Sequence, residues 1–164
     1  MKAKIVKTGI EIRPMAATDL AQVQAIAEGF PEAPHWPQSA YLNALNSQID
    51  PESTPRRIAL VATDPQSGPV RGFAVANLLP PEAELETIAV APASQRQGIG
   101  QFLFHALAAE LQAAGTREIL LEVRASNRPA LTLYRLLGFT QIGMRPGYYA
   151  DPIEDAVLMH LPLG

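Results

Sequence analysis

Cysteine is absent from the 164 residues of this sequence. Its absence excludes a thiol nucleophile, a cysteine-based zinc site and a disulfide framework, and it fits a reducing compartment. Apolar runs of about eighteen residues, the length that a membrane helix needs, are also missing. Residues 1–12 mix charged and apolar side chains as a strand does, unlike a signal peptide. We therefore expect a cytoplasmic protein without a membrane span.

Concentrated positive charge is missing as well. The formal net charge is −3, and the longest run of basic residues is the pair Arg56-Arg57. Nucleic-acid-binding proteins usually gather lysine and arginine into a patch, so no nucleic-acid partner is expected. The three histidines, His35, His105 and His160, have no acidic or cysteine companions at metal-ligand spacing, so no metal is expected either.

The length suits a single domain that spans residues 1–164. Period-two alternation between turn residues predicts strands, and apolar stripes closed by glycine predict helices. The order strand, helix, strand, helix, strand after residue 84 indicates an α/β (α+β) sheet with a right-handed crossover. The expected strands cover residues 10–13, 57–63, 70–79, 84–90, 118–124, 139–144 and 156–161, and the expected helices cover 19–28, 38–46, 98–114 and 127–137.

The junction between the strand 84–90 and the helix that begins near Gly98 has the character of an anion site. A helix amino terminus presents unpaired N–H groups and a partial positive charge, and Gly98 and Gly100 let an anion approach these groups closely. Arg96 adds a full charge. A Walker loop needs a Lys and a Ser or Thr that are not here, and a dinucleotide fingerprint needs a third glycine. The alternative is that the glycines only turn the chain into the helix.

This junction resembles the Gln/Arg-x-x-Gly-x-Gly/Ala signature of the GNAT N-acetyltransferases. The resemblance implies the GNAT fold, a mixed and mostly antiparallel sheet of about seven strands flanked by about four helices. It also implies that acetyl-CoA is the co-substrate. Main-chain groups of Ile88, Ala89 and Val90 are then expected to hold the pantetheine arm and acetyl group. The diphosphate is expected on the signature itself, Gln95-Arg96-Gln97-Gly98-Ile99-Gly100, and on Gln101.

Glu122 is an acid within the mainly apolar strand 118–124. Partial burial raises the pKa of a carboxyl toward the value that a general base for an amine needs. Such a base is required because an α-ammonium group, with a pKa of about 8, must lose its proton before its nitrogen attacks a thioester. The alternative reading pairs Glu122 with Arg124 or another cation, and position alone does not decide between the two.

Asn127 and Tyr134 are seven residues apart, about two helical turns, so they project from one face of the helix and can serve one ligand. By itself Asn127 is a good helix cap, and Tyr134 could be a core aromatic residue. The segments 121–127 and 130–139, however, resemble the ribosomal-protein-alanine branch of the GNAT family. That resemblance implies that Glu122 accepts the proton, Tyr134 protonates the leaving thiolate and Asn127 contacts coenzyme A.

Two further pairs are candidates for the acceptor side of the site. Glu84 and Glu86 share a face under period two, and other GNAT branches take their base from this strand, so Glu84 competes with Glu122. Otherwise the two carboxylates form an acidic wall for an ammonium, or simply an exposed strand face. The pair Tyr148-Tyr149 resembles tyrosines that border the peptide groove in the same branch, although a hydrophobic hairpin edge would look alike.

The resemblance implies direct acetyl transfer to a protein α-amino group, with the N-terminal alanine of a small-subunit ribosomal protein as one acceptor. The segment from Phe30 to Tyr41 is longer and richer in proline than its counterpart in that branch, which leaves the acceptor open. A small amine or antibiotic is the second acceptor class, and a non-catalytic acetyl-CoA sensor is the alternative to an enzyme. The carboxy-terminal strand could pair across a dimer, so we expect a monomer or a weak homodimer.

Overall fold

The computed structural model describes residues 5–7, 9–31, 35–50, 52, 56–66 and 68–164. These residues contain four α-helices and eight strands. The strands form one sheet with the order β1-β2-β3-β4-β5-β6-β8-β7. The strands are β1 (Ile5–Lys7), β2 (Ile10–Pro14), β3 (Arg56–Thr63), β4 (Val70–Leu79), β5 (Glu82–Val90), β6 (Glu118–Arg124), β7 (Thr140–Tyr149) and β8 (Glu154–Pro162). The helices are α1 (Leu20–Glu28), α2 (Gln38–Ile49), α3 (Ile99–Ala113) and α4 (Arg128–Leu136).

The expected fold class is confirmed. The sheet is antiparallel except for the β5–β6 pair, and the expected helices and strands are all present. The additional strand is β1, three residues that pair antiparallel with β2. β7 runs past Pro146, because its pairing with β8 resumes where Tyr149 faces Glu154. No helix in the described part of the chain is long and apolar enough to cross a membrane.

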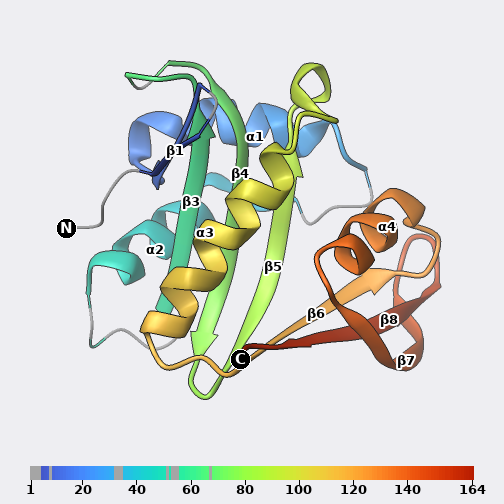
Figure 1. Ribbon diagram of the computed structural model, residues 1–164. Coiled ribbons are helices and arrows are strands. Elements are labelled where there is room, and N and C mark those ends of the chain that lie inside the picture. Colours follow the sequence, from blue (N-terminus) through green and yellow to red (C-terminus); the bar gives the residue numbers. More distant parts are fainter. Residues whose placement is uncertain (1–4, 8, 32–34, 51, 53–55, 67) are drawn as a thin grey trace.

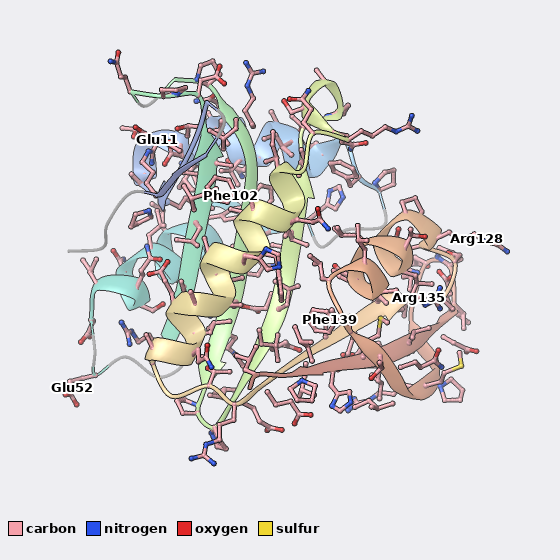
Figure 2. The ribbon with its side chains drawn as sticks, viewed as in Figure 1. Glu11, Glu52, Phe102, Arg128, Arg135 and Phe139 are labelled. Carbon is pink, nitrogen blue, oxygen red and sulfur yellow. The ribbon has the colours of Figure 1, made fainter. Side chains whose placement is uncertain are left out.

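Helices cover both faces of the sheet (Figure 1). On one face α3 packs against β3, β4 and β5, and its Leu103 and Leu107 are fully buried in the larger core cluster. Phe139, just before β7, belongs to this cluster (Figure 2). Its ring makes an edge contact with that of Phe104, at 5.5 Å between ring centres. On the other face α1 and α2 bury a second cluster, which contains Tyr41 and Phe73. The sheet is therefore a rigid support with a hydrophobic layer on each side.

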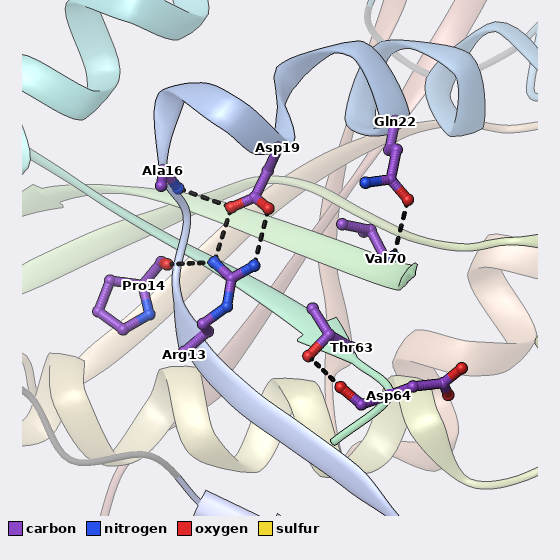
Figure 3. A network of polar contacts seen from close by, with 8 residues as sticks. All are labelled: Arg13, Pro14, Ala16, Asp19, Gln22, Thr63, Asp64 and Val70. Carbon is purple, nitrogen blue, oxygen red and sulfur yellow. Dashed lines mark hydrogen bonds and ion pairs between the residues drawn. The ribbon is translucent and has the colours of Figure 1, made fainter. Parts of the chain in front are cut away.

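A largely buried ion pair joins the start of α1 to the sheet (Figure 3). Arg13 on β2 donates to both carboxylate oxygens of Asp19, at 2.7 and 2.8 Å, and the backbone N–H of Ala16 donates to the same carboxylate at 2.8 Å. The side chain of Gln22 then accepts from the N–H of Val70 at 3.0 Å. These bonds fasten the start of α1 to β2 and β4.

The parallel pair of the sheet is short. β5 and β6 are in register only from Glu82 opposite Glu118 to Glu84 opposite Leu120. Beyond this point β5 stays with β4 as far as Val90, whereas β6 stays with β8. Figure 1 shows the two strands diverging, with α3 following β5 and α4 following β6. The edge of β5 that faces β6 therefore carries backbone groups that no strand pairs in the described residues beyond Glu84.

Candidate active site

The amino terminus of α3 has the form that an anion site requires. Gly98 is the N-cap, with a φ of +79°, and Arg96 also has a left-handed φ of +65°. No side chain caps this end, and the first bond back along the helix runs from the N–H of Phe102 to the carbonyl of Gly98, at 3.0 Å. In the described part of the chain, the N–H groups of the first three helical residues, Ile99, Gly100 and Gln101, have no acceptor.

The two glycines at this helix start have room around them. A Cβ built on Gly98 has no atom within 4 Å, and one built on Gly100 makes only ordinary contacts, at 3.7 Å with Val90 and 3.8 Å with Leu133. The exposed Arg96 lies beside the opening. A need to turn the chain explains the φ of Gly98, but it does not explain three free donors at an open position. Donors, charge and space together fit a diphosphate.

The side chains of the two glutamines in the loop close the loop on itself. Nε2 of Gln95 donates to the carbonyl of Val90 at 3.1 Å, and Nε2 of Gln97 reaches the carbonyl of Ala93 at 3.5 Å. At the preceding strand end, Ala89 is buried in the core beneath α1 and α2, whereas Ile88 and Val90 are half-buried. The Gln95 contact thus holds the loop that is expected to bind the diphosphate against the strand end that is expected to hold the pantetheine.

Glu122 carries a buried carboxylate oxygen, and no cation among the described residues forms a salt bridge with it. Its Oε2 has no hydrogen-bond partner in the described part of the chain. The guanidinium of Arg124 is directed elsewhere, to Oε1 of Glu154 at 3.3 Å. On the same strand Glu118 is already paired with His160. The alternative reading, in which Glu122 pairs with Arg124, is therefore not what the structure shows.

The other acceptor-side residues gather around Glu122. The pKa of Tyr148 is raised, first by hydrogen bonding with Glu122 and then by the charge of that carboxylate. Burial, followed by the charge of Glu122, raises the pKa of Tyr149 to about 12. The pKa of Glu84 is raised by burial and by the charges of Glu86 and Glu122. The structure therefore brings Glu84, Glu122 and both tyrosines together.

Glu86 differs from Glu84 because it is held in an ion pair. Nε and NH2 of Arg57 donate to its two carboxylate oxygens, at 2.7 and 3.1 Å. The guanidinium also lies 5.5 Å from the ring centre of Trp36. In the β4–β5 register, Val75 faces Thr87 and Ala76 faces Leu85, which leaves Glu86 as the extra residue of a β-bulge. The expected acidic wall is thus partly neutralised.

Asn127 and Tyr134 lie on α4. Oδ1 of Asn127 accepts from the N–H of Ala130 at 3.3 Å, so this residue is the helix cap that its position suggested. Tyr134 packs edge-on against Phe139, with 5.9 Å between ring centres. Burial raises the pKa of its phenol to about 12, with a smaller contribution from Tyr149. The phenol therefore remains protonated at neutral pH and can donate a proton.

Arg57 and Glu154 contact the candidate site but were not singled out from the sequence. Arg124 was considered there only as a possible partner of Glu122. Their contacts join strands that lie 29 or 30 residues apart, so no local pattern points to them. Within the described residues, no cluster of three or more His, Cys, Asp or Glu side chains could hold a metal ion.

Known proteins resemble this chain in sequence and in fold. The sequence profile of the acetyltransferase (GNAT) family matches residues 20–139. The [ribosomal protein bS18]-alanine N-acetyltransferase of Escherichia coli K12 is 44% identical over 100 residues, which cover 60% of this chain and 68% of that protein. The crystal structure of the corresponding Escherichia coli enzyme superposes with a TM-score of 0.76 at 34% identity, over 94% of both chains. Ard1 from Thermoplasma volcanium superposes with a TM-score of 0.80 at 27% identity, over 96% of this chain and 99% of that one.

Proposed function

The chain belongs to the GNAT family and is an acetyl-CoA-dependent N-acetyltransferase, and from this premise we propose that its acceptor is the α-amino group at the N-terminus of a protein. The observation that carries the proposal is the unpaired, buried carboxylate oxygen of Glu122 beside Glu84 and the two tyrosines. An ammonium group supplies the positive charge and the N–H donors that such a site lacks.

The coenzyme-binding part of the proposal uses the groups described above. The free N–H groups of Ile99, Gly100 and Gln101, together with Arg96, hold the diphosphate. Main-chain groups of residues 88–90 hold the pantetheine arm, and the side-chain nitrogen of Asn127 is the part of that residue left to contact the coenzyme once its oxygen caps α4. When bound, acetyl-CoA supplies an activated thioester.

The catalytic part assigns one proton to each of two residues. Glu122 accepts the proton of the α-ammonium, whose pKa of about 8 is about 2.5 units below that of a lysine side chain, so that an α-amine is the easier group to deprotonate. The amine nitrogen then forms the amide bond as the carbon–sulfur bond breaks, Tyr134 gives its proton to the sulfur, and the second proton that the nitrogen loses restores the phenol. Since one site holds both reactants, transfer is direct and needs no acetyl-enzyme.

The identity of the acceptor rests on the relatives. The Escherichia coli protein that is 44% identical over 100 residues is named for acetylation of an alanine of ribosomal protein bS18. We propose the same acceptor class here, a protein whose first residue is alanine. In the segment from Phe30 to Tyr41, Trp36 lies 5.2 Å from the ring centre of Tyr41 and 5.5 Å from the guanidinium of Arg57, which is paired with Glu86. Residues 32–34 of this segment lie outside the described part.

Intact-mass measurement on synthetic peptides tests the proposal. We expect a peptide that begins with alanine and also contains one lysine to gain a single acetyl group at its N-terminus, with no acetyl group left on the enzyme. The same peptide with a blocked N-terminus should gain none. Acetylation of free amines or of an antibiotic, with none of such peptides, would assign the enzyme to the small-amine class. Acetyl-CoA binding without transfer to any amine would indicate a sensor.

A further inference from the structure

Arg124 contacts three residues on the acceptor side of the proposed site. Its guanidinium lies 4.4 Å from the centre of the Tyr149 ring. Its NH1 donates to the carbonyl of Pro152 and its NH2 to the carbonyl of Ala150, both at 3.3 Å. Arg124 therefore ties the turn between β7 and β8 to the end of β6, two residues beyond Glu122.

Glu154 extends this connection to the coenzyme side. Its Oε1 accepts from Arg124 at 3.3 Å, and its Oε2 accepts from the backbone N–H of Ser126 at 2.6 Å. The bond from Ser126, helped by Arg124, lowers the pKa of the Glu154 carboxyl, so the carboxylate is charged at neutral pH. Ser126 directly precedes Asn127, the cap of α4. One ion pair thus joins the turn that carries Asn127 to the turn that follows Tyr149.

The pair is placed where it can have an effect. The side chains of Arg124 and Glu154 are only 18% and 17% exposed, so water screens them less than an ordinary surface pair. A planar guanidinium can stack on a ring and donate hydrogen bonds in its own plane at the same time, which a lysine cannot do. Arg124 can therefore hold the Tyr149 ring and the β7–β8 turn at the same time.

We propose that Arg124 is a positioning residue for the acceptor, which acts by holding Tyr149 and the β7–β8 turn against the proposed base Glu122, with Glu154 as its anchor. The inference rests on the proposed function, because it assumes that the acceptor amine enters at Glu122. It assigns a role to an arginine that is outside the groups proposed to move protons or to bind the diphosphate.

Steady-state kinetics with an alanine-initiated peptide tests the role. Replacing Arg124 by methionine keeps an unbranched stem but removes the stacking and the hydrogen bonds, and should raise the KM for the peptide about tenfold with a smaller change in kcat. The dissociation constant of acetyl-CoA should stay within about twofold of wild type. Arg124→Lys should fall between the two enzymes. Arg128→Met is the matched control, because this exposed arginine at the start of α4 contacts none of these groups in the described part of the chain.

A double-mutant cycle separates positioning from general damage. If Arg124 acts through Tyr149, then Arg124→Met should add little to the KM change already caused by Tyr149→Ala. If the two changes in KM multiply in the double variant, or if Arg124→Met and Arg128→Met change KM equally, the positioning role is wrong. Either result leaves the proposed function intact. If thermal unfolding shows that Arg124→Met is not folded, the same criterion is applied to Arg124→Lys. Failure of the wild-type enzyme to acetylate any peptide would overturn both proposals together.

Discussion

Glu122 and Arg124 lie two residues apart on β6, yet Arg124 pairs with Glu154 at 3.3 Å while a carboxylate oxygen of Glu122 stays buried and without a partner in the described part of the chain. Neighbouring opposite charges on one strand face would ordinarily neutralise each other. A buried carboxylate without a cation is costly for the fold, so its presence favours a functional role. Because Arg124 is engaged by Glu154, the proposed base stays available for a substrate.

Removal of the proposed base should therefore abolish turnover and leave coenzyme binding in place. We expect Glu122→Gln to lower kcat by roughly 10²- to 10⁴-fold, the usual contribution of a general base. The affinity for acetyl-CoA, measured by calorimetry, should change little, because the groups proposed to bind the diphosphate are at the start of α3 and not on β6. Glu118→Gln is the control on the same strand, since this carboxylate is already paired with His160. Full activity of Glu122→Gln together with an inactive Glu84→Gln would make Glu84 the base.

The charge of Glu122 should also be detectable at Glu84. The pKa of Glu84 is raised by burial first and then by the charges of Glu86 and Glu122. A neutral glutamine at position 122 removes one negative neighbour and makes ionisation of Glu84 easier, so its pKa should fall toward the ordinary value. Carboxyl ¹³C NMR titration measures the change. Glu82→Gln, at the exposed start of β5, should leave the pKa of Glu84 unchanged. An unchanged pKa in Glu122→Gln would contradict the proximity of the two carboxylates.

The parts of the site that sequence reasoning located are the local ones. The helix start at Gly98 and the cap at Asn127 depend on residues within one turn, so their pattern is visible in the chain itself. The bounds of α3 differ from the expected 98–114 by one residue at each end. The apolar alternation of residues 118–124 likewise places Glu122 on the face opposite Leu121 and Val123 without any tertiary information.

The parts that it missed depend on the register between distant strands. Period-two alternation treats Glu84 and Glu86 as equivalent, but a bulge and the Arg57 ion pair separate them. Neither is visible locally, because Arg57 lies 29 residues from its partner. The same holds for Arg124 and Glu154, which are 30 residues apart. From the sequence, Glu122 could be either a general base or the ion-pair partner of Arg124. Only the pairing of Arg124 with Glu154 in the structure distinguishes the two.

Tyr134 should behave as a proton donor that does not titrate in the working pH range. Burial raises its pKa to about 12, so the phenol stays protonated from pH 6 to about pH 10, and no basic limb of the kcat profile should arise from it. We expect Tyr134→Phe to lower kcat roughly 10²-fold with little change in coenzyme affinity. Tyr41→Phe, in the core beneath α1 and α2, controls for the loss of a buried hydroxyl. Wild-type kcat in Tyr134→Phe would leave the thiolate to be protonated by water.

The diphosphate site can be separated from the stability of the helix that carries it. A methyl group on Gly100 meets Val90 and Leu133 at ordinary contact distances, and alanine favours a helix over glycine, so Gly100→Ala should fold with unchanged or slightly higher stability. Alanine at this position also fits the family signature, so Gly100→Ala should keep its affinity for acetyl-CoA. Gln101→Glu, which adds a negative charge to the same helical turn without changing its shape, should instead lower that affinity about tenfold or more, because it repels the diphosphate. Gly98→Ala should instead cost about 1 kcal/mol of stability, because its φ of +79° disfavours a side chain. Thermal unfolding with and without acetyl-CoA measures both quantities. A Gln101→Glu protein that folds normally and binds the coenzyme as wild type does would mean that the open end of α3 is not where the diphosphate lies.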